Sequence, residues 1–440
     1  MCFSPIFVVP APRLGTKHTR VRENHTSDTW GKPQKAPRQH ETCPDPISRN
    51  GRLTAMPTNT NRLDAALSTA VTNGDLKAVA AAAWSSGRLD YEAAFGESNP
   101  GVAMRPDSML WIASLTKAVT AAAVMQLVER KVIELDKPAG ELVPYLRDVE
   151  VLDGFDNDGN PRLRKPAGPI TLRHLLTHTS GFGYDWADPD LARYSTTQPT
   201  PPAGSVASYE RPLIFDPGDR WAYGSGIDWA GRVLEAATGE ALDDYTRENI
   251  TTPLGMLDTT FTLSAAQRQR MTAMHRRSSN GLVPMAFERP EKPEMMPGGS
   301  GLCSTVHDYL RFARMILGSG ELEGAKVLRP ETVDAMCTDQ LGALTAPGWQ
   351  TQNAGFSNDV ALFPGQSTGW GLSFLINRQT SPQGRSAGSV AWAGLANSYY
   401  WIDRVKGVAG VFSTQVLPFF DAVALDTFAA FESAAYASIA

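Results

Sequence analysis

Hydrophobic residues are most concentrated between residues 111 and 131, in the segment WIASLTKAVTAAAVMQLVERK. Its alanines, valines, leucines and methionine favour a helix, and the apolar positions are spread around the expected turns. This pattern predicts a mostly buried helix. Ser114 stands where the helix would begin and has the residue type of a helix cap. Lys117, three residues later, would lie beside Ser114 on the first turn, at the positive end of the helix dipole.

Shorter apolar runs, separated by turn residues, occur toward both ends of the chain. Residues 61–74 have the spacing of an amphipathic helix, and residues 78–84 and 90–96 predict two strands joined by a tight turn. We therefore expect an α/β fold of the α+β type, in which an antiparallel sheet is flanked by helices. The C-terminal runs predict a meander before a closing amphipathic helix, at residues 370–377, 389–394, 398–403 and 407–414.

The middle of the chain has a different texture, because prolines and polar residues interrupt the apolar pattern. A second clear helix begins near Ile227 and ends at Gly239. Residues 184–220 predict a wall dominated by loops, and loops and short helices are expected after Gly239. We expect a mostly helical insert over about residues 131–294.

Composition and charge indicate how the chain is organised. The 440 residues are 42% hydrophobic and 20% charged, which is enough for a large core. Residues 1–55 hold nine Lys and Arg against four Asp and Glu and lack periodicity, which predicts a disordered basic extension. The folded domain would span residues 57–440, with its α/β part formed by about residues 60–130 and 295–440.

Several function classes are disfavoured. No apolar run reaches the roughly 20 residues of a membrane helix, so we expect no membrane association. The net charge of −5 argues against binding to nucleic acid. The N-terminal segment lacks the features of a secretory signal, and the four cysteines have no metal or redox spacing. We expect a cytoplasmic protein with a small-molecule substrate, and the sequence leaves its oligomeric state open.

Two patterns suggest metal binding but fit it poorly. A calcium loop beginning at Gly154 would end at Lys165, and neither residue supplies a suitable ligand. Residues 157–159, Asn-Asp-Gly, instead predict a hairpin turn. His174 and His178 have the i, i+4 spacing of metal ligands, but no glutamate or third ligand accompanies them. We expect both histidines to be structural and the protein to need no metal or cofactor.

Two glycine-containing motifs also lack the context that catalysis requires. Residues 384–388 match G-x-S-x-G, but no strand precedes the serine and no helix follows it, as a nucleophile elbow would need. Residues 298–305 form a glycine-rich turn without the Lys-Ser/Thr ending of a phosphate loop. After this turn, Thr305 with Asp308 resembles a capping box for a helix over residues 306–317.

Ser114 and Lys117 form an S-x-x-K pair that could carry nucleophilic chemistry. A serine attacks well only when a base takes its proton, and a lysine becomes a base when burial or a neighbouring charge lowers its pKa. Taken alone, the pair also fits a helix cap beside a surface lysine. Tyr223, followed by Ser225, precedes the second helix, and Trp392 lies on a late predicted strand. Each aromatic residue by itself also fits a hydrophobic core.

Taken in order, S-x-x-K, Y-x-S and W-x-G resemble the three motifs of the serine β-lactamase and penicillin-binding-protein superfamily. The segment LLTHTSGFG, the W-x-Y opening of the second motif and W-x-G in place of K-T-G are most like family VIII carboxylesterases. The segments VLDGFDNDGNPRLR and ITLRHLLTHTSG are also similar to the fungal acyltransferase that builds the lovastatin side chain. The resemblance covers about residues 60–440 and implies a β-lactamase/transpeptidase-like fold.

The resemblance implies a serine carboxylesterase acting on short-chain acyl esters. Ser114 would form an acyl-enzyme, and Lys117 and Tyr223 would share the proton transfers as general base and acid. Which of the two takes the first proton is left open. The backbone N–H groups of Ser114 and Leu395 would hold the oxyanion.

The third motif departs from the lactam-processing pattern, in which a lysine attracts the carboxylate of the substrate. Trp392 occupies that place and offers apolar area without a fixed charge, so a neutral ester should suit the pocket better than an anionic lactam. Gly394 would line the same pocket. Ser225 stands where many members have asparagine.

Three alternatives to ester hydrolysis remain. The same acyl-enzyme could pass its acyl group to an alcohol acceptor, or it could turn over β-lactams weakly. A non-catalytic scaffold related to penicillin-binding proteins is the alternative from another class. The intact serine, lysine and tyrosine argue against the scaffold.

Overall fold

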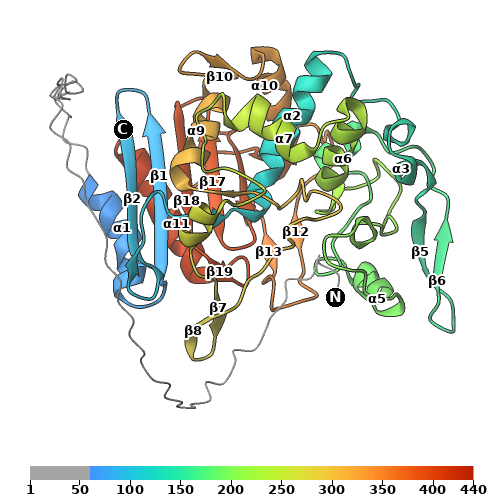
Figure 1. The fold of residues 1–440 in the computed structure, drawn as a ribbon, viewed down its shortest axis with the longest axis horizontal. Helices are drawn as coiled ribbons and strands as arrows, with labels where there is room; N and C mark the ends of the chain where they lie inside the picture. The colour runs from blue at the N-terminus through green and yellow to red at the C-terminus, as the bar shows by residue number, and fades with distance from the viewer. Residues whose placement is uncertain (1–59, 440) are drawn as a thin grey trace, which may run out of the picture. The chain divides into compact units, whose positions relative to one another are not determined.

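The computed structural model describes residues 60–439, and the predicted N-terminal extension therefore lies outside the described residues. An eight-stranded antiparallel sheet has the strand order β14-β15-β16-β17-β18-β1-β2-β3. Strands from opposite ends of the described chain lie side by side in it (Figure 1), because β1 (Ala78–Ser85) pairs with both β18 (Val408–Ser413) and β2 (Leu89–Asn99). The predicted hairpin at residues 78–96 is thus β1 and β2.

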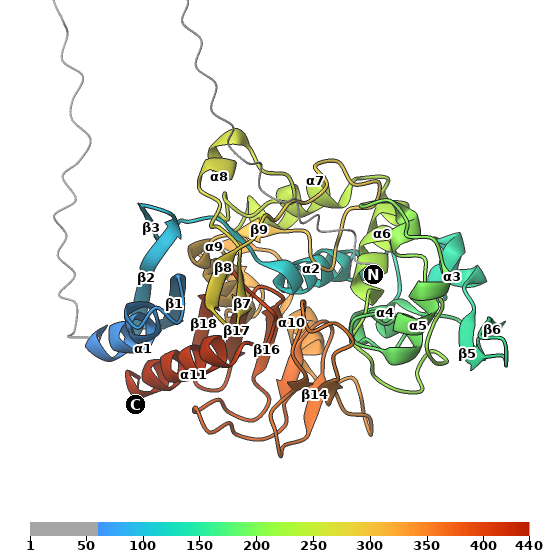
Figure 2. The same cartoon turned by 90° about the horizontal axis from the view of Figure 1, so that it is seen from below.

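Both faces of β1 are buried. Ala80 and Ala82 belong to one core cluster, whereas Val79 and Ala81 belong to the other, as expected from side chains that alternate along a strand. Helices α1 (Thr60–Thr72) and α11 (Ala422–Ala437) cover one face of the sheet, and α9 (Val306–Leu317) packs on the other (Figure 2). Helices on both faces explain why β1 is apolar at consecutive positions.

The C-terminal part contains the predicted meander with one correction. Its strands are β14 (Thr368–Trp370), β15 (Leu375–Asn377), β16 (Val390–Gly394), β17 (Ser398–Asp403) and β18. The single strand expected at residues 370–377 is wrong, because β14 and β15 form a hairpin in which Trp370 faces Leu375. Leu372 and Phe374, in the turn between them, are fully buried, so the apolar run marks a turn inside the core.

Helix α2 (Thr116–Glu129) is the predicted buried helix, and every residue from Thr116 to Leu127 is buried. It packs against α6 (Gly226–Thr238), which ends at Gly239 in the left-handed conformation, as its sequence predicted. The two helices bring residues near 114 and 225 together. Helix α9 likewise begins after Thr305, whose side chain accepts a hydrogen bond from the backbone N–H of Asp308.

The segment expected as a helical insert contains short helices and two hairpins. Its helices are α3 (Pro144–Asp148), α4 (Leu172–Thr177), α5 (Pro189–Thr197), α6, α7 (Leu242–Thr246) and α8 (Ala265–Gln269), with 3-10 turns at Ala139–Glu141 and Val206–Ser208 and a π-helical turn at Arg247–Thr251. Hairpin β5 (Val151–Phe155) and β6 (Pro161–Arg164) contains the predicted Asn-Asp-Gly turn.

The second hairpin, β7 (His275–Ser278) and β8 (Gly281–Pro284), lies where only loops and short helices were expected. Strand β7 also pairs in parallel with β19 (Val416–Leu417), a contact between distant segments that local sequence does not encode. The remaining elements are β3 (Val102–Ala103), β4 (Leu110–Trp111), β9 (Cys303–Ser304), β10 (Glu321–Leu322), β11 (Ala325–Lys326), α10 (Pro330–Cys337), β12 (Gly348–Trp349) and β13 (Val360–Ala361). Within residues 60–439, no helix is both long and apolar enough to cross a bilayer.

Candidate active site

Ser114 lies in a 3-10 turn, Ala113–Leu115, directly before α2. It is the one partly exposed residue in an otherwise buried stretch from Leu110 to Leu127. Ser114 does not cap the helix as expected, because α2 begins at Thr116 and has no side-chain cap. The Thr116 hydroxyl closes the turn instead by donating to the Ala113 carbonyl at 2.6 Å. Ala113 has a φ of 45°, a strained value for a residue with a side chain, immediately before the serine.

Lys117 is fully buried, and three oxygen atoms surround its amine. Its Nζ lies 3.1 Å from Ser114 Oγ, 2.8 Å from the Gly299 carbonyl oxygen and 3.3 Å from Tyr184 Oη. The structure therefore brings Ser114 and Lys117 together at the head of α2. The contacts with Gly299 and Tyr184 were not foreseen from sequence.

Tyr223 is buried just before α6, with its ring centroid 4.8 Å from Lys117 Nζ. Its hydroxyl accepts a hydrogen bond from Trp392 Nε1 at 3.2 Å. The lysine amine thus lies over the ring of Tyr223, whereas the phenol that it contacts through a hydrogen bond is that of Tyr184. Gly224 lets this turn pass close to the backbone, because a Cβ there would lie 2.0 Å from the Phe182 carbonyl oxygen.

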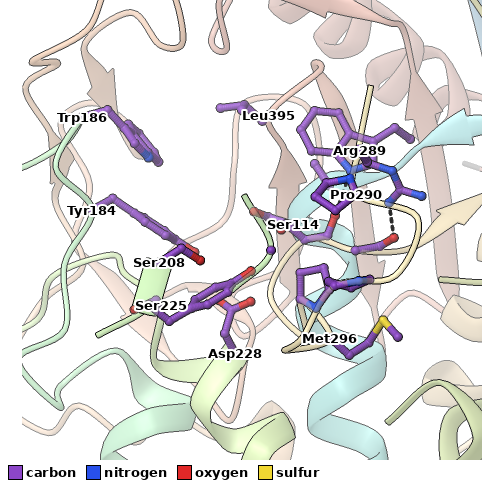
Figure 3. Close-up of a pocket in the computed structure, with 18 of the residues that line it drawn as sticks. Ser114, Tyr184, Trp186, Ser208, Ser225, Asp228, Arg289, Pro290, Met296 and Leu395 are labelled. Atoms are coloured by element: carbon purple, nitrogen blue, oxygen red, sulfur yellow. Dashed lines mark hydrogen bonds between the residues drawn. The ribbon is translucent and has the colours of Figure 1, made fainter. Parts of the chain in front are cut away.

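The end of β16 packs against the turn that carries Ser114. A Cβ on Gly394 would lie 2.4 Å from the carbonyl oxygen of Ile112, so only glycine allows this approach. Leu395 follows directly and lines the same pocket as Ser114 (Figure 3). Ser225 also lines the pocket, from the start of α6.

The two histidines make separate hydrogen bonds, one within its own helix turn and one to a distant segment. His174 Nδ1 accepts from the Thr171 N–H at the start of α4. His178 is buried with its ring centroid 4.9 Å from that of Tyr223, and its Nδ1 accepts from the Gly224 N–H at 3.4 Å. Burial, assisted by the charge of Lys117, holds the pKa of His178 well below its usual value. Among the described residues, no group of three or more His, Cys, Asp or Glu could hold a metal ion.

Aromatic side chains that sequence reasoning missed form one wall of the pocket. Tyr184 and Trp186 come from the middle segment and lie on the opposite side of Ser114 from Arg289, Pro290 and Met296 (Figure 3). Trp349 completes this wall, with its ring centroid 5.3 Å from Trp186 and 5.2 Å from Tyr223. Tyr184 and Trp186 lie in a segment without motif spacing, where the sequence Y-D-W was their only signal, and Trp349 lies in the two-residue strand β12.

Residues 287–297, which we call the proline strap, form the facing wall. The ring of Phe287 lies 4.5 Å from that of Trp111, measured between centroids. Arg289 donates to the backbone carbonyls of Gly301 and Phe261. The Glu294 N–H donates to the Gly204 carbonyl at 2.7 Å. The strap is therefore tied to segments at both of its ends.

Comparison with known proteins identifies the family of this chain. The Beta-lactamase family model matches residues 63–434, and the chain belongs to this family. The resemblance and the β-lactamase/transpeptidase-like fold predicted from sequence are thereby confirmed.

Two fungal enzymes are among its relatives. The chain is 33% identical over 379 residues to monacolin J acid methylbutanoyltransferase of Aspergillus terreus, covering 80% of this chain and 89% of that protein. It is 32% identical over 372 residues to lovastatin esterase of Penicillium rubens, covering 80% of this chain and 92% of that protein. These relatives place the chain among enzymes of the serine β-lactamase-like superfamily.

Solved structures show the same relationship. A mutant of simvastatin synthase from Aspergillus terreus matches with a TM-score of 0.74 at 31% identity, over 85% of this chain and 94% of that one. EstCE1, described as a hydrolase with promiscuous acyltransferase activity, matches with a TM-score of 0.67 at 18% identity, over 86% of this chain and 98% of that one. The second likeness shows a shared fold.

Proposed function

We propose that this protein cleaves carboxylic esters through an acyl-enzyme on Ser114. The observation that carries the proposal is the partly exposed Ser114 hydroxyl with the Lys117 amine 3.1 Å away, at a pocket lined with aromatic residues. A hydroxyl becomes a strong nucleophile when a neighbouring base accepts its proton. Ser114 is the described serine that has this combination of exposure and amine contact.

In the first half-reaction, Ser114 Oγ bonds to the acyl carbon and its proton passes to Lys117 or Tyr223. The resulting oxyanion is held by backbone N–H groups of Ser114 and Leu395. The tetrahedral intermediate collapses, the bond to the alcohol oxygen breaks, and the same proton goes to the leaving alkoxide. In the second half-reaction, water attacks the acyl-enzyme, releases the carboxylic acid and restores the serine.

The substrate would be a neutral ester with a short acyl chain. Trp392, Trp186 and Trp349 give the pocket wall apolar area, and no lysine stands at the third motif to attract a carboxylate. An anionic β-lactam would therefore be a poor substrate. A cytoplasmic location stays part of this proposal.

Transfer of the acyl group to an alcohol is a second candidate function. Its support is the 33% identity, over most of both chains, to a methylbutanoyltransferase. Hydrolysis and transfer share the acyl-enzyme and differ only in whether water or an alcohol accepts the acyl group. The ratio of acyl transfer to hydrolysis can therefore be measured.

The test is a panel of p-nitrophenyl esters, with and without an alcohol acceptor, and nitrocefin as the lactam. We expect Ser114→Ala to abolish nitrophenol release and to prevent labelling by a fluorophosphonate probe. The matched control is Ser386→Ala, in the unused G-x-S-x-G loop, which should retain full activity. Unchanged activity in Ser114→Ala would contradict the proposal, and a wild-type protein without adduct or turnover would favour the scaffold.

A further inference from the structure

Asp228 is a buried carboxylate in the first turn of α6 that no sequence motif identified. It is only 2% exposed and lines the pocket beside Ser225 (Figure 3). Its Oδ1 accepts a hydrogen bond from the backbone N–H of Gly299 at 2.8 Å. Burial of a carboxylate is energetically unfavourable unless the group is hydrogen-bonded or paired with an opposite charge.

Gly299 links this carboxylate to the catalytic lysine. Its N–H donates to Asp228, while its carbonyl oxygen accepts from Lys117 Nζ at 2.8 Å. The neighbouring Gly298 carbonyl accepts from the Thr120 hydroxyl at 2.7 Å, one turn along α2 from the lysine. The glycine turn is therefore held between α2 and α6.

The close packing leaves no room for a side chain at position 299. A Cβ on Gly299 would lie 2.4 Å from Asp228 Oδ2, so the carboxylate rests directly on the glycine backbone. The contact with Asp228 accounts for the glycine at position 299.

The geometry points to Asp228 as a positioning residue that fixes Gly299, whose carbonyl in turn holds the Lys117 amine beside Ser114. This inference rests on the proposed function. Among the described residues, the hydrogen-bond partners of Lys117 Nζ are a serine hydroxyl, a phenol and a backbone carbonyl rather than a carboxylate, although the buried amine needs a compensating charge when protonated. Gly299 lies between the carboxylate of Asp228 and the amine of Lys117, so the negative charge is near the amine without bonding to it directly. The Nζ atom therefore remains within reach of Ser114 Oγ.

Electrostatic coupling supports the same arrangement. Burial raises the pKa of Asp228, and the charge of Lys117 opposes that shift. Tyr184 faces the same cluster, and the nearby charge of Asp228 adds to the effect of burial in raising its pKa. Tyr223 and the neutral His178 are further titratable groups near the amine.

The test separates the hydrogen bond of Asp228 from its charge. Asp228→Ala removes both, and we expect kcat for p-nitrophenyl butyrate to fall about 100-fold with KM changed less than about threefold, because the amine is displaced while the substrate walls remain. Asp228→Asn keeps an oxygen that can accept from Gly299, and should recover about tenfold or more of that loss. The pH profile of its kcat/KM should move to lower pH, because removal of a negative charge lowers the pKa of the ionisable groups around it.

Asp308→Asn is the matched control. Asp308 is also buried and accepts a backbone hydrogen bond, from Asp258 at 2.7 Å, but it has no contact with the site. This variant should keep the wild-type pH profile and kcat even if its melting temperature falls.

Wild-type kcat in a folded Asp228→Ala would overturn the role of Asp228, as would an unshifted pH profile in Asp228→Asn. If Asp228→Ala does not fold, the Asn profile alone decides. Failure of the proposed function is a separate result, because it would appear as wild-type activity in Ser114→Ala.

Discussion

The indole of Trp392 donates a hydrogen bond to the hydroxyl of Tyr223 at 3.2 Å. An indole N–H can only donate, so the phenol oxygen must be the acceptor and its own proton is directed elsewhere. The tryptophan of the third motif thus orients the tyrosine of the second. Apolar area is only part of what Trp392 contributes to the site.

Removing this N–H while keeping an aromatic ring should slow acylation. We expect Trp392→Phe to lower kcat for p-nitrophenyl butyrate about tenfold through loss of one hydrogen bond to a reacting group. Trp370→Phe is the control, because Trp370 is also buried and packs against Trp392, but its indole N–H donates to the Leu176 carbonyl and not to Tyr223. Equal rates in the two variants, after correction for folded fraction, would show that the bond is catalytically neutral.

The two phenols near Lys117 should differ in importance. Tyr223→Phe removes the proposed proton carrier, and we expect kcat/KM to fall about 1000-fold, within the usual range for general acid–base catalysis. Tyr184→Phe removes a phenol 3.3 Å from the amine and should cost about tenfold or less. Stopped-flow measurement of the nitrophenol burst would give both acylation rates. A larger loss in Tyr184→Phe would reassign the proton carrier.

A methyl group at Gly394 should separate β16 from the serine turn. Gly394→Ala would place its Cβ 2.4 Å from the Ile112 carbonyl oxygen, so one of the two segments must move. We expect the free energy of unfolding to fall by about 1–3 kcal/mol and ester hydrolysis to be lost in the folded fraction. Urea melts and single-turnover rates would measure the two effects. Gly168→Ala has open space around its Cβ and should match the wild type in both.

Buried His178 should make the protein less stable in mild acid. Its folded pKa is depressed far below 6.5, whereas the unfolded chain takes up the proton near that value. The unfolded state therefore binds more protons below pH 6.5, and the free energy of unfolding falls as pH decreases. Above pH 6.5 both states are neutral and this residue contributes no slope.

His178→Asn provides the comparison, because asparagine tolerates the φ of 57° found at this position. We expect its urea-derived stability to decline less between pH 6.5 and 5.5, by up to about 1.4 kcal/mol per pH unit. Identical slopes in the two proteins would mean that the imidazole takes up a proton in the folded state.

The fold was predictable wherever apolar spacing was sustained. The buried helix α2 and the strands near residue 400 follow directly from periodicity. The prediction of a single strand at residues 370–377 was wrong because buried residues are apolar whether they lie in a strand or in a turn, and Leu372 is buried within a turn. Ser114 likewise has a capping residue type, but Thr116 closes the turn in its place.

The site was predictable only where residues sit at motif spacing. Lys117 is three positions from Ser114, so a single helical turn brings them together. Asp228, Gly299 and Trp186 reach the site through packing between segments distant in sequence. Hydrophobic periodicity does not predict such contacts. A hydrogen bond to a backbone group does not depend on residue type, so the only sequence feature linked to it here is the glycine that allows the close approach.

Strand β1 lies between β2 and β18, so its second edge is filled only by a segment synthesised much later. A nascent chain that has left the ribosome as far as α6 would already contain Ser114, Lys117 and Tyr223. It would still present β1 with an open, alanine-rich edge, which is a template for unwanted pairing. Chaperone capture during translation would therefore matter more for this protein than for one whose sheet closes through neighbouring hairpins.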